Sequence, residues 1–350
     1  MNTNVKDEGN GPNPVGFELQ RCETTFMGTT LRDVIIDSAW MPGVNGARCE
    51  DRVESSSRAF PKWRGGADGR LGPAVPIKGP FIFSSKPTSA LAIMMKGMPH
   101  WFAGQHLPFM QHGRPDPERA RWAGLRAAAI SASYIIVYAA SREMDIDPDE
   151  IEVLEPLIRR SGGLQPALHF ADRAANGSGY CDFLGKGDRP LAAEIIRRLV
   201  RGEDPWLEDV KSASHLADCS KACYRCLMRY GNMPWHSTLD WRLGMDWIAL
   251  LDNADWKPSA ADWWRPDPMG DLRRVAETAK RRLLGSDIID GANGPWLILP
   301  KRQGKPETRI QIVHPFREET AQQQPFQEIW DSFNMDRRPM LVRQWVWGRS

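Results

Sequence analysis

The stretch HLADCSKACYRC at residues 215–226 holds three of the six cysteines of this 350-residue chain. His215, Cys219, Cys223 and Cys226 follow one another at intervals of four, four and three residues. Soft ligands at this spacing can wrap around one tetrahedral ion, and three thiolates with a neutral imidazole suit Zn2+. Four protein ligands leave no open coordination position, so we expect a structural zinc ion rather than a catalytic one.

The three cysteines are common to every version of this prediction, whereas the fourth ligand has three candidates. We favour His215, because its proximity closes the shortest loop and so costs the least chain entropy. His236 lies ten residues after Cys226 and can fold back, and Cys181 is otherwise unassigned. Both alternatives stay open at this point.

Two enzymatic metal chemistries use similar residues. Cys-x3-Cys-x2-Cys is also a spacing that holds an iron-sulfur cluster in radical S-adenosylmethionine enzymes. Here the motif lies two-thirds along the chain with no train of strand-helix units after it, so this is the least favoured alternative. A zinc deaminase needs His-x-Glu, whereas Leu216 and Ala217 follow His215. Walker-type phosphate loops are also missing from the sequence, so we predict no catalytic residues.

The composition limits where this protein works. Its 41% hydrophobic and 26% charged residues are typical of a folded globular protein. A net charge of +2 excludes a polycation, so any nucleic-acid binding must come from a local patch. Residues 1–14 are polar and contain no secretory signal, and the apolar run 130–140 is short for a membrane span. We therefore expect a cytoplasmic protein with no membrane partner.

The pattern of elements predicts an α+β fold: a mixed α/β domain with a β-rich N-terminal part, a long central helix and a structural zinc knuckle. Asp116-Pro117-Glu118 starts a helix that should reach about Met144. Asp240 caps another helix beside the metal site. The predicted divisions are a disordered tail at 1–14, the β-rich part at 15–115, a helical zinc-binding domain at 116–255 and a small α/β appendage at 256–350.

Shorter elements are also readable from the sequence. Residues 256–268 look like a linker rich in Trp, Pro and Asp, and a helix should follow at 272–284. Another helix is expected at 190–201. Extended segments are expected at 34–36, 81–83, 91–95, 165–170, 296–299 and 309–313.

The densest part of the pattern, residues 215–247, reads HLADCSKACYRCLMRYGNMPWHSTLDWRLGMDW. The run Cys-Leu-x-x-Tyr-x-Asn from Cys226, the later His236 and Leu-Asp-x-Arg ending at Arg242 resemble the signature of one family. This is the zinc-binding domain of mitomycin-repair-type (MrfA-type) superfamily 2 helicases, also found in helicase-partner proteins of DISARM-type phage defence. The resemblance covers roughly residues 88–252. In helicase-fused members four cysteines bind zinc, and the first would fall at Ala217, so His215 must substitute here.

The resemblance implies a module that works with a DNA helicase motor, and the motor is missing from this chain. It therefore implies a non-enzymatic accessory subunit of a superfamily 2 helicase on another chain. Its partners would be that helicase and DNA, single-stranded or at a junction, in antiviral defence or DNA repair. The alternative is a purely architectural scaffold of a defence complex that does not touch nucleic acid.

The same segment carries residue types that bind nucleic acid. Basic side chains can neutralise phosphates, and aromatic rings can stack on unpaired bases at ~1–3 kcal/mol per base. In the alternative interpretation the aromatic residues belong to the core, and Arg242 pairs with Asp240 or the helix surface. The candidate contacts are Lys221, Tyr224, Arg225, Arg229, Tyr230, Trp235, His236 and Arg242.

Overall fold

The protein is represented by a computed structural model. It describes residues 17–30, 48–51, 80–95, 117–154, 156–160, 164–174, 177–187, 189–301, 307–316 and 327–348. The predicted tail at 1–14, the extended segment at 34–36 and the helix-capping Asp116 lie outside these residues.

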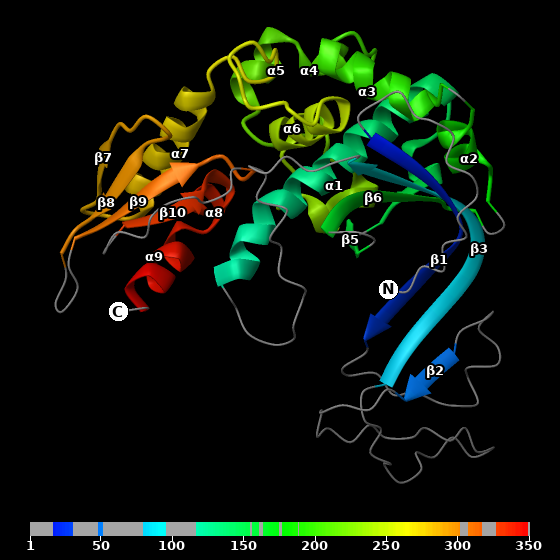
Figure 1. The fold of residues 1–350 in the computed structure, drawn as a ribbon, viewed down its shortest axis with the longest axis horizontal. Coiled ribbons are helices and arrows are strands. Elements are labelled where there is room, and N and C mark those ends of the chain that lie inside the picture. The colour runs from blue at the N-terminus through cyan, green and yellow to red at the C-terminus, as the bar shows by residue number, and fades with distance from the viewer. Residues whose placement is uncertain are drawn as a thin grey trace.

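The first sheet has six strands, with the order β1-β3-β6-β4, and β2 and β5 pair with β3 and β6. All its pairings are antiparallel. β3 pairs with β1 along almost its whole length but with β6 only at residues 90–94, so the β1–β3 ribbon extends beyond the rest of the sheet (Figure 1). The extended segments predicted at 81–83 and 91–95 are parts of this one strand. The strands are β1 Phe17–Thr30, β2 Arg48–Asp51, β3 Pro80–Met95, β4 Ile151–Val153, β5 Leu157–Arg160 and β6 Leu164–Asp172.

The predicted long helix is confirmed as α1, Pro117–Met144. Its alanine-rich middle is buried against the first sheet and against helix α6, Trp241–Asp252. A Cβ at Gly244 of α6 would lie 2.8 Å from the Ile135 side chain of α1, so glycine permits this close approach. Residues 123–144 are long and apolar enough to cross a membrane, and 83% of the apolar 18-residue window within them is buried inside the protein.

Short helices lie between the strands of the first sheet, and between that sheet and α6. They are the 3-10 helix η3 Pro148–Glu150, α2 Tyr180–Gly185, α3 Leu191–Arg201, α4 Leu207–Val210, α5 Ala213–Asp218 and the 3-10 helix η4 Tyr230–Trp235. The buried carboxylate of Asp172 accepts the backbone N–H groups of Gly179, at 2.6 Å, and Cys181, at 2.9 Å. The glycine turn before α2 is thus wrapped around an internal anion.

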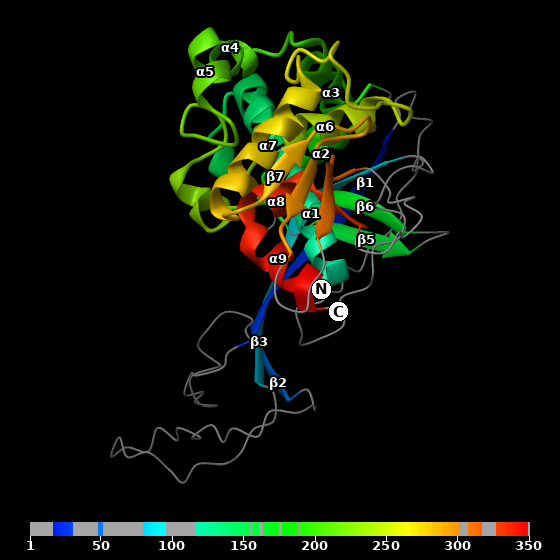
Figure 2. The same cartoon turned by 90° about the vertical axis from the view of Figure 1, so that its left-hand side faces the viewer.

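A second sheet of four strands, β10-β9-β8-β7, lies at the opposite end of the molecule (Figures 1 and 2). β9 and β10 are parallel, and the other pairs are antiparallel. This second sheet shares a core with the helices that precede and follow it in the chain. The core includes Ala276, Ile312, Trp330 and Met335. The elements are α7 Pro268–Arg282, β7 Asp287–Ile289, β8 Trp296–Leu299, β9 Thr308–Val313, β10 Gln327–Asp331, α8 Ser332–Arg337 and α9 Pro339–Gly348.

The three tryptophans of residues 256–268 pack against the first core, although the composition of this stretch suggested a linker. Trp264 is only 2% exposed and stacks on Trp256 with ring centroids 6.3 Å apart. Phe316, which follows β9, packs edge-on against Trp247 of α6 at 5.9 Å. The C-terminal residues therefore contribute to the first core, and the fold is the predicted α+β class with its two sheets joined through α1, α6 and this segment.

Candidate metal centre

The structure brings four of the predicted side chains together. One ligand atom from each of His215, Cys219, Cys223 and Cys226 lies within 4.8 Å of the others. The Sγ of Cys226 is 3.8 Å from the Sγ atoms of both Cys219 and Cys223. Two sulfurs bound to one tetrahedral zinc at about 2.3 Å would be separated by about 3.8 Å, so the thiols already have the spacing of a metal site.

His215 completes the cluster because of how its ring is held. The residue lies in α5, where the Oγ of Ser212 accepts its backbone N–H at 3.3 Å. Its Nδ1 lies 2.8 Å from the carbonyl oxygen of Val210 and therefore carries the proton. Its Nε2 is buried and has no hydrogen-bond partner among the described residues. Metal-binding histidines are held in this way, with one nitrogen fixed by a carbonyl and the other available.

The other two candidates for the fourth position are used elsewhere. The Nε2 of His236 lies 2.9 Å from both the carbonyl oxygen of Arg229 and the Oδ1 of Asn232. Cys181 is buried in α2, at the end of the first sheet, and is not part of the four-residue cluster.

The thiols influence one another strongly. The hydrogen bond from Cys226 lowers the pKa of Cys219 to about 5, against the effect of burial and with help from His215. The same contact, together with burial, raises the pKa of Cys226. A cation in place of the shared protons would let both sulfurs be thiolates, because the thiolate is the form that binds metal. The donor set can therefore hold a metal ion.

Backbone hydrogen bonds shape the loop around the thiols. The Cys223 N–H donates to the Sγ of Cys226 at 3.2 Å, and the Cys226 N–H donates to the Cys223 carbonyl at 3.1 Å. The first residue of α6 also contacts this loop, because the Trp241 N–H donates to the Lys221 carbonyl at 2.8 Å. The Trp241 indole N–H also donates to the Cys219 carbonyl at 3.2 Å.

Asn232 organises the chain after the last cysteine, a role that sequence reasoning missed. Its Nδ2 donates to the Tyr138 hydroxyl of α1 at 2.9 Å and to the Leu227 carbonyl at 2.8 Å. Its Oδ1 accepts the Arg229 N–H at 2.9 Å, and the residue is only 2% exposed. The signal in the sequence was the Cys-Leu-x-x-Tyr-x-Asn run, which ends at this residue.

Most of the predicted nucleic-acid contacts make contacts within the protein. Lys221 forms an ion pair with Asp336 of α8. Arg229 is exposed, and its guanidinium lies 4.7 Å from the ring centroid of Tyr138. The half-buried Trp235 lies under Arg126, His236 holds Asn232, and Arg242 donates to three backbone carbonyls.

Three predicted contacts besides Arg229 are exposed to the solvent. Tyr224 is 73% exposed and Tyr230 is 87% exposed. Arg225 is exposed and donates to the Ser214 Oγ at 3.0 Å. Met233, which the sequence did not single out, is a further exposed apolar residue on the same segment.

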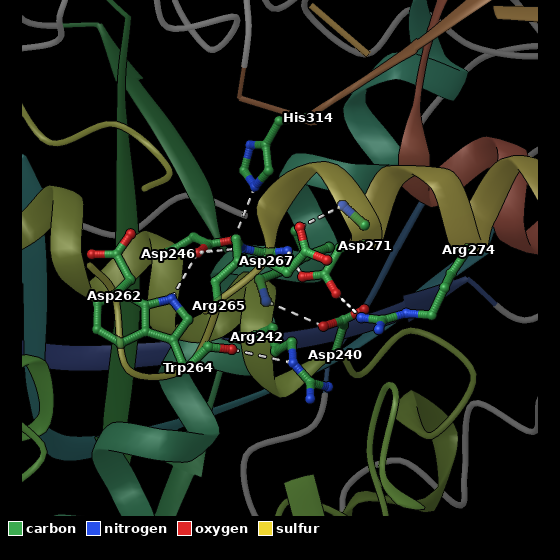
Figure 3. Close-up of polar contacts among 12 residues, drawn as sticks. Asp240, Arg242, Asp246, Asp262, Trp264, Arg265, Asp267, Asp271, Arg274 and His314 are labelled. Carbon is green, nitrogen blue, oxygen red and sulfur yellow. Dashed lines mark hydrogen bonds and ion pairs between the residues drawn. The ribbon is translucent and has the colours of Figure 1, made fainter. Parts of the chain in front are cut away.

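A buried charge network centred on α6 was also missed (Figure 3). Asp246, in the middle of α6, is fully buried and accepts the indole N–H of Trp264 at 2.8 Å. Arg265 donates to both of its oxygens, and the Nε2 of His314 lies 2.9 Å from Oδ2. The network joins α6 to the end of β9. An Asp among the apolar residues of a helix was the available signal.

Comparisons with known proteins identify no family. No family model matches the sequence, and no curated protein matches it. The crystal structure of the DUF1998 helicase MrfA bound to DNA aligns with 69% of this chain at 12% sequence identity and a TM-score of 0.30. The aligned part is 26% of that helicase, so this chain spans about a quarter of its length. Similarity at this level does not identify a function.

Proposed function

We propose that this chain is a zinc-binding accessory subunit of a DNA helicase, with no enzymatic activity of its own. The observation that carries the zinc assignment is the buried Nε2 of His215, which has no partner in the part of the chain that the structure describes and lies beside three thiols at metal-site spacing. Four protein ligands would complete a tetrahedral shell, which leaves no position for water or substrate. The role of such an ion is structural, and its binding energy contributes to folding.

The association with a helicase rests on the sequence resemblance of residues 215–247. The residues of the family signature hold the chain in place around the metal centre. Asn232 and His236 hold the chain after Cys226, and Arg242 holds the chain at Cys219. This agreement favours a knuckle of that family over a chance cluster of cysteines. The ATPase would reside on a superfamily 2 helicase, and the assembly would act in the cytoplasm in phage defence or DNA repair.

Direct DNA binding would use the solvent-exposed side chains of the zinc knuckle (the knuckle, residues 215–236). Tyr224 and Tyr230 present exposed rings that can stack on unpaired bases, and Arg225 can reach a phosphate. Single-stranded DNA or a junction is therefore the expected nucleic-acid partner.

A purely architectural role without DNA contact is the second candidate. It is favoured by the contacts of Lys221 with Asp336 and of Arg242 with backbone carbonyls, which take two positive charges away from the predicted binding surface. An iron-sulfur radical enzyme has less support, because its cluster keeps one iron open for the cofactor, whereas the cluster here offers a fourth ligand, His215.

Elemental analysis and co-purification test the proposal. The full chain should contain one zinc per molecule, be colourless, and show no ATPase activity. Co-expressed with the superfamily 2 helicase of its own genome, it should co-purify and increase DNA unwinding by that helicase. Well-folded protein without metal, or brown protein that contains iron, would contradict the zinc assignment. A zinc-containing protein that neither binds the helicase nor changes unwinding would contradict the helicase role alone.

A further inference from the structure

Arg242 makes an unusual set of contacts for a residue first considered a DNA contact. Its Nη1 donates to the Cys219 carbonyl at 2.7 Å, and its Nη2 donates to the Leu216 carbonyl at 3.2 Å. Its Nε donates to the Trp264 carbonyl at 3.2 Å (Figure 3). The guanidinium also lies 4.4 Å from the ring centroid of Trp241, its neighbour in the chain.

Two of these carbonyls belong to the piece of chain that carries the first two metal ligands. Helix α5 spans only six residues, contains His215 and ends immediately before Cys219. A helix this short is not stable by itself, and the carbonyls of its last turn lack partners within the helix. The Leu216 carbonyl is one of them, and Arg242 supplies its donor.

The planar guanidinium is suited to this task. It offers several N–H donors in a fixed fork, so one rigid group sets the directions of two carbonyls three residues apart. A lysine ammonium could reach one carbonyl but could not reproduce the fork. Trp241 supports the arrangement, since its indole N–H donates to the same Cys219 carbonyl.

We propose that Arg242 is a positioning residue of the metal centre, which orients His215 and Cys219 by holding the carbonyls of Leu216 and Cys219. The proposal rests on the proposed zinc site. It adds Arg242, which is not a ligand, as a residue that determines the zinc affinity of that site. Arg242 thus acts like the outer partners of other metal sites, whose loss typically weakens metal binding about 10–100-fold.

Two other roles for Arg242 predict different behaviour. It also lines a groove of about 530 Å³ between the knuckle, α7 and α8, so a nucleic acid in that groove would meet its guanidinium. Alternatively, its bond to the Trp264 carbonyl could simply hold the segment before α7, in which case it would stabilise the fold and leave the metal unaffected.

The test compares Arg242→Lys and Arg242→Met with a control, Arg198→Lys, in the full chain. Arg198 is a partly buried Arg on α3 that bonds to Glu143 and Asp204 and makes no hydrogen bond or ion pair to the metal-binding segment among the described residues. Zinc affinity is measured by competition with a chromophoric chelator. The visible absorption of Co2+ bound in place of zinc reports the ligand geometry.

Both Arg242 variants should bind one zinc at saturation with an affinity about 10–100-fold lower, and the Co2+ bands should shift. Arg198→Lys should leave both readouts at their wild-type values. Wild-type zinc affinity in folded Arg242 variants would overturn the proposal, and a simultaneous loss of DNA binding would assign Arg242 to the groove. If neither variant folds with zinc in excess, the proposal is also overturned, because Arg242 is then needed for the fold in general. If the wild-type chain binds no zinc, the proposed function itself is wrong.

Discussion

The Nδ1 of His215 donates to the carbonyl oxygen of Val210 at 2.8 Å, and this one contact determines which ring nitrogen is available to a metal. The tautomer with the proton on Nδ1 leaves Nε2 with a lone pair. Because Val210 is the last residue of α4, a contact within the fold sets the orientation of the ring.

Replacing His215 by Ala should reduce zinc retention far more than replacing His236 by Ala. The first change removes a ligand. The second removes a donor to Arg229 and Asn232, so it should cost about 1–3 kcal/mol of unfolding free energy while the zinc stoichiometry stays at one. Elemental analysis after dialysis against a chelator, with chemical denaturation in parallel, measures both. The opposite order of zinc loss would place His236 in the fourth position.

Local patterns in the sequence predicted much of the fold. The apolar spacing and the Asp240 cap gave α6, and the Pro-Glu start gave α1. The cysteine spacing gave the metal cluster, because ligands within twelve residues of one another need no knowledge of the rest of the fold. The strand β8 was also predicted at its observed bounds, because its apolar run is a local pattern.

Features that depend on distant partners were not predictable. Lys221 looked available for DNA until its partner was known, and Asp336 lies in a helix near the end of the chain. His314 is 68 residues away from Asp246. The tryptophans of residues 256–268 resembled a linker in composition, whereas their partners are on α6 and after β9. No local pattern contains this information.

Arg265→Met should strongly destabilise the protein. The change leaves Asp246 charged, fully buried and with Trp264 and His314 as its remaining partners. Removing one partner of a buried ion pair typically costs about 3–5 kcal/mol. The control, Arg309→Met, removes a pair with Glu307 at the surface and should cost about 0–1 kcal/mol. Equal midpoints in urea for the two variants would show that the Asp246 network contributes little.

Stability should fall as the pH decreases from about 7 to 5, and His314 should account for part of the loss. Burial lowers the pKa of His314 below its ordinary value, although Asp246 opposes this. The Phe316 N–H donates to Nδ1 at 3.2 Å, so the folded protein holds the neutral ring. The unfolded chain therefore binds more protons below about pH 6.5, which favours unfolding. The stability is present above that pH and is lost below it.

His314→Gln isolates this contribution, because the Gln amide can still donate to Asp246 but does not titrate. Its unfolding free energy should depend less on pH between 7 and 5 than that of the wild type, measured by urea denaturation. Asp246 acts at lower pH: burial alone would raise its pKa, but Arg265 and His314 lower it to about 2. Its contribution should disappear only as the pH falls from about 4 towards 2. Parallel pH profiles for wild type and variant would contradict the role of His314.

Stacking on DNA should depend on the two exposed tyrosines. Tyr224→Ala and Tyr230→Ala should each weaken binding of single-stranded DNA by about 1–3 kcal/mol, with one zinc still bound. Phe183→Ala is the matched control, since Phe183 is an exposed aromatic residue on α2, outside the knuckle. Fluorescence anisotropy with a labelled oligonucleotide measures the affinities. An equal effect of all three substitutions would show that the tyrosines have no specific role.

Arg225→Glu should weaken DNA binding and reduce its dependence on salt. Each phosphate contact on single-stranded DNA contributes about −0.7 to the slope of log K against log salt, so the slope should become flatter by about this amount. The Arg225–Asp218 pair at 3.7 Å is exposed on both sides, so its loss should cost little. Reversal of Lys221 or Arg229 would instead break contacts to the mostly buried Asp336 and to Tyr138. Arg142→Glu, with a side chain 47% exposed against 49% for Arg225, controls for net charge and should leave the slope unchanged. If neither affinity nor slope changes in Arg225→Glu while the helicase still co-purifies, the chain does not use this face to bind DNA, and the architectural role takes its place.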